Sequence, residues 1–399
     1  MNILILDEEF PYPLNTGKRI RSYNLIKRLA VHHKVHYLAY GKEDSDNFRA
    51  MHDAGLHPRA VPPQVPAKSG FLFYIRLFLN LFSRYPYIVS SHYSRVFQKA
   101  VHEAVAEITP DIVISEWSPY AIFVKDLRGP RKIMVAHNIE HLIWNRYYEN
   151  EKWAPKKWYI GKQMTKVMNF ELAAFNWVDG AIAVSEIEAA SIKELNPKIP
   201  VQVVENGVDL EYFRPSPAKT DRHQLIFVGA MNWRPNQDAI QHFVHDILPL
   251  IRRKTPDIEA VFVGQDPPPQ IKKLGEIPAV KIVGQVDDVR PYVMKAAVYI
   301  VPLRIGGGTR LKIVEALAMG KAVVSTSVGA EGLLVTDGKE ISLADTPEKF
   351  ATAVERLLND GDLRARLGRA GRELVEKHYD WNRLAEKLSL FLCRVAEGR

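Results

Sequence analysis

Three consecutive glycines, followed by basic residues and a glutamate, offer the clearest chemistry in this sequence. The stretch IGGGTRLKIVE occupies residues 305–315. Its residues that could contact a ligand are Gly307, Gly308, Thr309, Arg310, Lys312 and Glu315. Glycine lets other atoms approach the backbone, N–H groups at a helix start favour anions, and arginine can bind phosphate through two N–H groups. The stretch therefore predicts a phosphate site at the start of a helix.

An ordinary glycine-rich turn explains the same stretch equally well on spacing alone. Lys312 and Glu315 would then form a surface pair worth about 0.3 kcal/mol. The helix that carries them is predicted to end at Gly320, a residue type favoured just beyond a helix end. Neither standard nucleotide fingerprint occurs, because no stretch has P-loop spacing and the first strand is not followed by G-x-G-x-x-G.

Strands that alternate with helices must position these residues. A first series of apolar, β-branched runs covers residues 2–6, 35–40, 111–116, 132–138, 180–185 and 201–208. A second series covers residues 225–231, 259–264, 280–286, 298–303 and 322–327. Buried strands that alternate with helices indicate parallel sheets covered on both faces. The fold class is therefore α/β, with two doubly wound domains whose ligands lie beyond the carboxyl ends of strands.

The length of 399 residues also favours two domains. Residues 209–224 are rich in proline and charge and form the expected linker. We expect an N-terminal domain over 1–208 and a C-terminal domain over 209–378. A last amphipathic helix over 379–399 is expected to pack back on the first domain.

The charge balance suggests an anionic partner. Lys and Arg number 54 against 46 Asp and Glu, and the net charge is +8. Such a surplus suits nucleic acid, a membrane surface or a phosphorylated small molecule. Basic residues are scattered and no common nucleic-acid motif occurs, which argues against nucleic acid. The single cysteine, Cys393, and a first strand without signal-peptide features favour a cytoplasmic protein.

Several motifs occur in order and resemble the retaining GT-B glycosyltransferases of family 4. They are VENGVDLEYF, FVGAMNWRPNQDAI, the long run from VGQVDDV to VGAEGL, and the closing YDW. The resemblance implies two Rossmann-like domains that face each other across a cleft. It also implies transfer from a UDP- or GDP-linked sugar to a glycan or lipid-linked acceptor, without a metal or other cofactor, in polysaccharide or glycolipid synthesis.

The resemblance assigns roles in the second domain and reveals two departures. The family carries two glutamates separated by seven residues; the second falls on Glu315, which would accept hydrogen bonds from the ribose hydroxyls. The first falls on Gly307, so the carboxylate expected at the donor sugar is missing. The usual Arg and Lys after the first strand of this domain are also missing, and Arg310 and Lys312 are the candidates to replace them, ahead of Arg234.

In the first domain the family's phosphate loop corresponds to LNTGKR, with Gly17 as its main position and Lys18 or Arg19 as helpers. An ordinary loop glycine at a helix start is the alternative. His137 lies at the end of a predicted strand, where family members place a histidine near the sugar. It could equally be a structural histidine, and His141 and Glu140 stand in the same loop.

The chemistry implied is stabilisation of the departing diphosphate by preorganised donors. His137 and Arg310 are the predicted catalytic residues, and no enzyme nucleophile is expected. A D-x-D metal motif occurs at Asp44–Asp46, which we interpret as a solvated loop. A GT-B-fold epimerase or phosphorylase and a non-enzymatic nucleic-acid binder are the competing hypotheses.

Two segments could contact a membrane surface. Residues 70–89 and 152–170 combine aromatic, aliphatic and basic side chains, as interfacial helices do. Buried core helices would have a similar composition. The longest apolar stretch, residues 71–82, is too short to span a bilayer, which needs roughly 20 residues.

Overall fold

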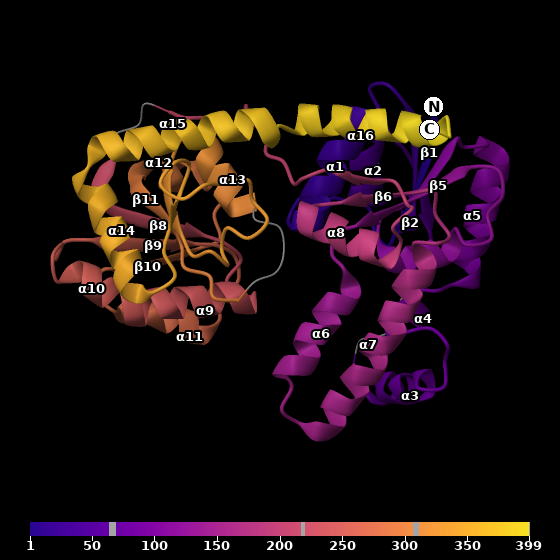
Figure 1. The fold of residues 1–399 in the computed structure, drawn as a ribbon, viewed down its shortest axis with the longest axis horizontal. Helices are drawn as coiled ribbons and strands as arrows, with labels where there is room; N and C mark the ends of the chain where they lie inside the picture. The colour runs from indigo at the N-terminus through magenta and orange to yellow at the C-terminus, as the bar shows by residue number, and fades with distance from the viewer. Residues whose placement is uncertain (64–68, 217–219, 306–310, 399) are drawn as a thin grey trace. The chain divides into compact units, whose positions relative to one another are not determined.

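The computed structural model describes residues 1–63, 69–216, 220–305 and 311–398, and divides into two compact units (Figure 1). The first unit comprises Met1–Glu205 and Asn382–Arg399, and the second comprises Asn206–Trp381. The sequence placed the division after residue 208 and the return of the chain at residue 379.

The first unit contains a parallel seven-stranded sheet in the order β3-β2-β1-β4-β5-β6-β7. The strands are β1 (Asn2–Asp7), β2 (Lys34–Tyr40), β3 (His57–Val61), β4 (Ile112–Ser115), β5 (Arg131–Ala136), β6 (Gly180–Ala183) and β7 (Val201–Val203). Ser115 of β4 pairs with Leu6 of β1 and with Met134 of β5. The carboxyl ends of these three strands therefore lie side by side.

Helices follow most strands of the first unit. They are α1 (Gly17–Leu29), α2 (Asp46–Asp53), α3 (Phe71–Asn80), α4 (Tyr87–Ser90), α5 (Arg95–Ile108), α6 (Glu140–Asn150), α7 (Ala154–Ala174), α8 (Glu186–Leu195) and the last helix α16 (Trp381–Ala396). The helix α16 contacts the first unit, as Arg28 Nε donates to Asn382 Oδ1 at 2.7 Å and Lys387 pairs with Glu205 at 3.1 Å.

The second unit contains a parallel six-stranded sheet in the order β10-β9-β8-β11-β12-β13. Its strands are β8 (Asp221–Val228), β9 (Glu259–Val263), β10 (Val280–Gly284), β11 (Ala296–Val301), β12 (Ala322–Ser325) and β13 (Ser342–Leu343). Its α-helices are α9 (Arg234–His242), α10 (Leu248–Arg252), α11 (Pro269–Lys272), α12 (Arg290–Lys295), α13 (Leu311–Ala318), α14 (Pro347–Asn359) and α15 (Gly361–His378). All six residues of β11 are buried. Because successive strand residues point to opposite faces, both faces of the sheet are covered there.

Two parallel sheets with intervening helices confirm the predicted α/β class. The strands β3 and β13 were not predicted. The strand β3 contains Pro58 and Arg59, and it is an edge strand, where proline is tolerated. The predicted end of the phosphate-loop helix is confirmed, because Gly320 follows α13 with φ of 69° and donates to Leu317 O, while Lys321 donates to Ala316 O.

The prediction left two readings of the segment from residue 70, and the core-helix reading is wrong for α3. Only Asn80 of this helix is buried, and its aromatic and aliphatic side chains are largely exposed. Within the described residues, no helix combines the length and apolar character needed to cross a membrane.

Candidate functional site

The side chain of Lys312, on α13, reaches the carboxyl end of β8. Its Nζ donates to Asn236 Oδ1 at 2.6 Å and lies 4.4 Å from the ring centroid of Phe227 in β8. A Cβ atom added to Gly229 would lie 2.8 Å from this Nζ, so glycine at position 229 leaves room for the ammonium group. The hydrogen bond to Asn236 places the Lys312 ammonium group at a strand end.

The backbone around this ammonium group is closely packed. Gly229 N donates to Val263 O at 2.9 Å, and a Cβ atom on Gly264 would come within 1.9 Å of Gly229 O. Asn236, which is buried on α9, also donates through Nδ2 to Ala230 O at 2.8 Å. Asn236 therefore fixes both the loop after β8 and the Lys312 side chain.

Glu315 lies one turn further along α13. Burial raises the pKa of its carboxyl group to about 7, and the positive charge of Lys312 acts in the opposite direction. Burial, and next the nearby Glu315, raise the pKa of Tyr299 on β11 well above its usual value. Part of the Glu315 side chain remains accessible to solvent. A carboxylate so placed can accept hydrogen bonds from hydroxyl groups of a ligand.

Four other predicted site residues of this unit fall outside the described residues. They are Gly307, Gly308, Thr309 and Arg310. Their predicted contacts with a diphosphate stay predictions. Arg234, the less favoured substitute cation, is exposed at the first position of α9.

In the first unit, Gly17 begins α1 at the carboxyl side of β1. Thr16 caps this helix, with Oγ1 accepting from Arg19 N at 3.3 Å. Both cations beside Gly17 have carboxylate partners: Lys18 Nζ lies 2.6 Å from Asp7 Oδ1, and Arg19 contacts Glu9 through two nitrogens at 2.7 and 2.5 Å. The helpers predicted for Gly17 are therefore engaged by the acidic run that follows β1.

The Asp7–Lys18 pair is buried and tightly linked to its surroundings. Tyr37 Oη donates to Asp7 Oδ2 at 2.6 Å, and Lys18 Nζ also lies 3.1 Å from Glu8 Oε1. Burial raises the pKa of Asp7, although Lys18 opposes the effect. For Lys18, burial lowers the pKa, but Asp7 and Glu8 outweigh burial and raise it above its usual value. The pair thus holds the first turn of α1 against the end of β1.

His137 follows β5, as the sequence predicted, and faces a buried carboxylate. Its Nε2 lies 3.4 Å from Glu116 Oε1, and Glu116 directly follows β4. Ser22 Oγ on α1 donates to the same Glu116 oxygen at 2.5 Å. Burial acts to raise the pKa of Glu116, but His137, Ser22 and Lys18 outweigh it and keep the pKa below its usual value. A charged Glu116 can fix the orientation and tautomer of the imidazole.

The neighbouring residues of the same loop have other partners. His141 Nδ1 lies 2.7 Å from Glu171 Oε2 on α7, which gives His141 a structural role. Glu140 Oε1 accepts from Trp117 Nε1 at 2.8 Å, and burial raises the pKa of Glu140 to about 7, with Trp117 opposing and Glu171 adding to the rise. The Lys18 ammonium lies 5.7 Å from the ring centroid of Trp117. Glu140 is therefore linked through Trp117 to the residues that follow β1.

Metal-binding residues do not gather in the part of the chain that the structure describes. There, no group of three or more His, Cys, Asp or Glu side chains could hold a metal ion. The D-x-D stretch lies at the exposed start of α2, where Ser45 caps the helix by accepting from Phe48 N.

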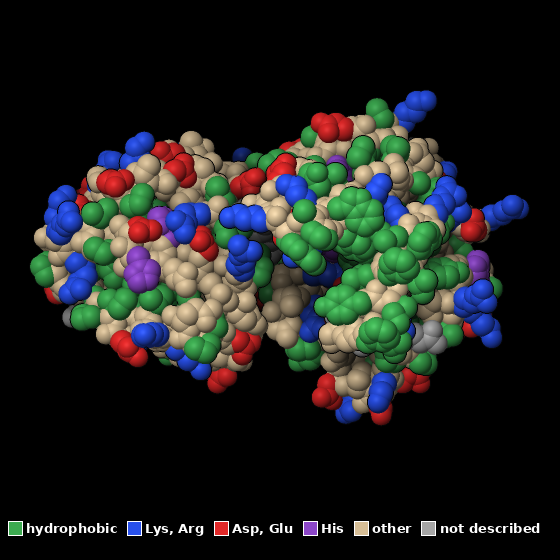
Figure 2. Space-filling model, turned by 90° about the horizontal axis from the view of Figure 1, so that it is seen from below, with side chains coloured by type: hydrophobic (Ala, Val, Ile, Leu, Met, Phe, Trp, Pro, Cys, Tyr) green, Lys and Arg blue, Asp and Glu red, His purple; other side chains and the backbone are tan. Residues whose placement is uncertain are grey.

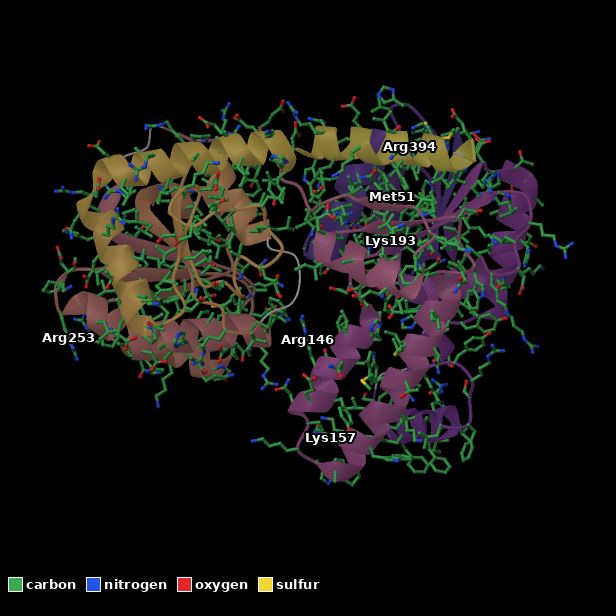
Figure 3. All side chains as sticks on the ribbon, viewed as in Figure 1. Met51, Arg146, Lys157, Lys193, Arg253 and Arg394 are labelled. Atoms are coloured by element: carbon green, nitrogen blue, oxygen red, sulfur yellow. The ribbon has the colours of Figure 1, made fainter. Side chains whose placement is uncertain are left out.

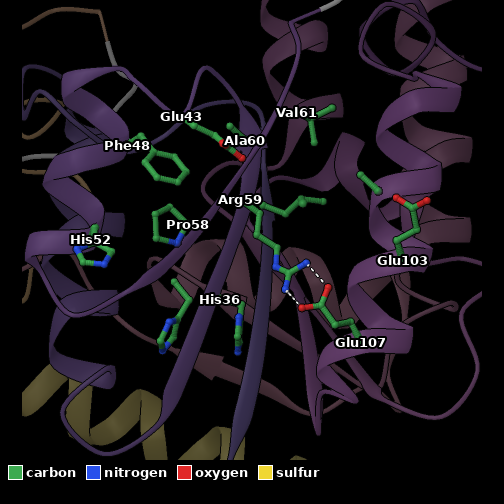
Figure 4. A pocket seen from close by; sticks show the side chains of 13 residues that line it. His36, Glu43, Phe48, His52, Pro58, Arg59, Ala60, Val61, Glu103 and Glu107 are labelled. Carbon is green, nitrogen blue, oxygen red and sulfur yellow. Dashed lines mark hydrogen bonds and ion pairs between the residues drawn. The ribbon is translucent and has the colours of Figure 1, made fainter.

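A separate groove of about 690 Å³ runs along the edge strand β3 (Figure 4). His36 and His57 stack there with ring centroids 4.9 Å apart, and Arg59 forms a two-bond ion pair with Glu107 (Figure 4). None of the predicted site residues lines this groove. The candidate site is instead formed by the loops that follow the strands.

Two protein-family models match this chain, and together they include most of both units. The model described as "Glycosyltransferase Family 4" matches residues 17–212, and that described as "Glycosyl transferases group 1" matches residues 222–360. The chain belongs to the family 4 glycosyltransferases. The resemblance inferred from the motifs is therefore confirmed.

Curated relatives of this family 4 chain include two proteins of Mycobacterium tuberculosis. A phosphatidyl-myo-inositol mannosyltransferase is 30% identical over 224 residues, which is 52% of this chain and 58% of the relative. A GDP-mannose-dependent alpha-(1-6)-phosphatidylinositol monomannoside mannosyltransferase is 30% identical over 229 residues, with 51% and 56% covered. The chain thus spans little more than half the length of the curated relatives it matches.

Solved structures share the fold. Sucrose-phosphate synthase from Thermosynechococcus elongatus matches with a TM-score of 0.72 at 17% identity, and each chain is covered completely. HepE from Anabaena, in complex with UDP, matches with a TM-score of 0.69 at 14% identity over 98% of this chain and 100% of HepE. These matches confirm the GT-B class for the family 4 chain.

Sequence reasoning missed Asn236 and Glu116 in the candidate site. Asn236 stands in NWRPNQ, the segment where the family's usual cations are missing, and Glu116 ends the apolar run DIVISE. A polar residue directly after a buried strand was the available signal for Glu116. Asn236 gave no comparable signal, because its partner Lys312 is 76 positions away.

Proposed function

We propose that this chain transfers a hexosyl group from a nucleoside-diphosphate sugar to a glycan or lipid-linked acceptor, with retention of configuration. Family membership supports sugar transfer. The observation that carries the proposal is the Lys312 ammonium at the carboxyl end of β8, in the domain whose family position lacks its usual Arg and Lys. A cation reaching that position from α13 restores charge where family members bind the diphosphate.

Predicted donor-binding groups occur in each unit. Lys312 would contact the diphosphate, with Arg310 and the N–H groups of Gly307, Gly308 and Thr309 as further donors. Glu315 would accept hydrogen bonds from the ribose hydroxyls. The backbone N–H of Gly17, at the first turn of α1, would contribute a donor from the first unit.

Cleavage of the anomeric bond leaves negative charge on the diphosphate. Lys312, Arg310 and the backbone donors would stabilise that charge, which lowers the barrier without a covalent enzyme intermediate. His137 would hydrogen-bond to the sugar, in an orientation set by Glu116 at 3.4 Å. In this proposal the protein supplies the stabilising charges itself, so the reaction is metal-independent.

The names of the relatives indicate which donor and which acceptor should be tested first. Two of them are named as mannosyltransferases that act on phosphatidylinositol lipids, and one name specifies GDP-mannose. We therefore propose GDP-mannose as the first donor and a lipid-linked acceptor, with UDP sugars as the alternative. The reaction would take place in the cytoplasm, at the inner face of the membrane.

A thermal-shift series with GDP-mannose, UDP-glucose and the free nucleosides tests the proposal. A ligand that binds only the folded protein stabilises it by about 2.7 kcal/mol at a concentration of 100 times Kd, so the true donor should raise Tm clearly. Arg310→Ala should lower kcat/KM by at least about tenfold. If no nucleotide sugar raises Tm above the level of the nucleosides, the proposal is wrong.

A further inference from the structure

The helix α3 exposes a concentrated set of large apolar side chains. Phe71 and Phe82, in and next to it, are 79% exposed, and Phe78 and Leu79 are 60% exposed. Leu72, Tyr74 and Ile75 are exposed as well. Soluble monomers rarely leave a contiguous apolar surface of this kind uncovered, so it marks a contact surface.

These side chains occupy one side of α3. At 3.6 residues per turn, the exposed apolar positions from 71 to 82 fall within an arc of about 160°. Asn80 points to the opposite side and is tied to the body of the unit: Gln163 Nε2 donates to Asn80 Oδ1 at 2.9 Å, and Lys166 Nζ donates to Asn80 O at 2.6 Å. The polar contacts with α7 therefore hold α3 with its apolar side outward.

The helices α6 and α7 form a hairpin that extends away from the seven-stranded sheet, and α3 lies beside α7 (Figure 1). Lys157 lies at the far end of this hairpin (Figure 3). Trp153 and Trp158 are 65% and 56% exposed in the same segment. Tryptophan is enriched where a protein meets the headgroup region of a bilayer. We call α3 and the far end of the hairpin, residues 152–158, the apolar face.

Positive charges outnumber negative ones around the apolar face, where Glu151 pairs with Lys156 at 2.6 Å. Between Asp53 and Glu103 the sequence contains six Lys and Arg and no acidic residue. Between Glu151 and Glu171 it contains five Lys and again no acidic residue. In the space-filling view, hydrophobic side chains gather over the first unit, with basic and acidic side chains at its margins (Figure 2). This arrangement is complementary to an anionic surface.

We propose that the apolar face docks on an anionic lipid bilayer, with α3 lying in the headgroup region. A broad apolar arc bordered by cations, on a helix of ten residues, suits binding in the plane of the membrane rather than across it. The excess of positive charge favours anionic lipid over a second copy of this chain, because two such faces would repel each other. The inference rests on the proposed function, because docking on a membrane would bring this chain to a lipid-linked acceptor.

Flotation with lipid vesicles tests the proposal on the full chain. The wild type should bind vesicles of equal parts phosphatidylcholine and phosphatidylglycerol at low salt, and bind pure phosphatidylcholine weakly. Phe78→Ser with Leu79→Ser should lower the partition coefficient by at least about tenfold, because two fewer apolar side chains are transferred from water into the membrane. Val31→Ser, at a residue that is 73% exposed elsewhere in the unit, is the matched control and should bind as the wild type does.

A second variant isolates the charge contribution. Lys152→Ala with Lys157→Ala should weaken binding to the anionic vesicles by about fivefold per cation and reduce its salt dependence. The Tm and the donor-induced rise in Tm should be unchanged in both double variants, so a failure to dock is distinguishable from a failure of the proposed function. Equal vesicle binding by the wild type and the Phe78/Leu79 variant would overturn the proposal. Loss of a dimer in that variant with unchanged vesicle binding would also overturn it.

Discussion

The carboxyl edges of the two sheets hold positive charge in different ways. In the first unit, Lys18 and Arg19 are engaged by Asp7, Glu8 and Glu9 at 2.5–3.1 Å. In the second unit, Lys312 donates to the neutral amide of Asn236, and its charge also acts on the carboxyl group of Glu315. A cation that is bonded to a carboxylate must break that ion pair to bind a phosphate, which disfavours Lys18 and Arg19 as phosphate ligands. We therefore expect Lys312 to bind the diphosphate, as proposed, and Lys18 and Arg19 to have mainly structural roles.

Among the variants that test this comparison of the two units, the largest effect is expected at His137. His137→Ala should lower kcat by at least about 100-fold, because a positioned imidazole commonly contributes that much to group transfer. The affinity for nucleoside diphosphate should change little, because His137 is expected to contact the sugar and not the diphosphate. Steady-state kinetics together with calorimetric titration of GDP and UDP measure both quantities.

Glu116→Gln should lower kcat by about tenfold, as for other residues that orient a functional histidine. The substitution keeps the shape but removes the charge that faces His137 Nε2. Glu116→Asp retains the charge and should recover part of kcat, and a purely structural role would not give this order. A wild-type kcat in Glu116→Gln would show that the pair does not act on the reaction.

We expect Glu315 to make donor binding depend on pH. Its pKa of about 7 means that it is protonated below that pH, and ribose hydroxyls bind best to the carboxylate. Donor affinity should therefore fall by up to about tenfold for each pH unit below 7 and level off above it. Glu315→Gln should remove the dependence. The same raised pKa makes protonated Glu315 stabilising, and this stability should be lost as the pH rises through about 7.

The smallest expected effect is at Gly229. A Cβ atom there would lie 2.8 Å from Lys312 Nζ and 2.8 Å from Asn236 Nδ2, so Gly229→Ala should displace the ammonium group. We expect a rise in donor KM of about fivefold with a nearly unchanged kcat. Gly361→Ala, in the same unit, is the control variant. Gly338→Ala would not serve as a control, because Gly338 has a φ of 75°. Equal donor KM values for Gly229→Ala and wild type would contradict the placement of Lys312.

The sequence predicts what is local and misses what is brought together by folding. Apolar runs predict β1 and β11, and Gly320 predicts the end of α13, because strand burial and helix ends leave local patterns. The contacts of Lys312 with Asn236, and of His137 with Glu116, join residues from different strand–helix connections. Neither contact follows from spacing. The edge strand β3 was not predicted because Pro58 and Arg59 interrupt the apolar run that is typical of a strand.

The most direct test of the division between the two units is the affinity for nucleoside diphosphate, measured by calorimetry in Lys312→Ala, Lys18→Ala and the exposed control Lys272→Ala. We predict a loss of at least about tenfold for Lys312→Ala, which corresponds to about 1.4 kcal/mol. Lys272→Ala should bind as the wild type does, and Lys18→Ala should lose thermal stability while keeping most of its affinity. Wild-type affinity in Lys312→Ala, with a large loss in folded Lys18→Ala, would contradict the account.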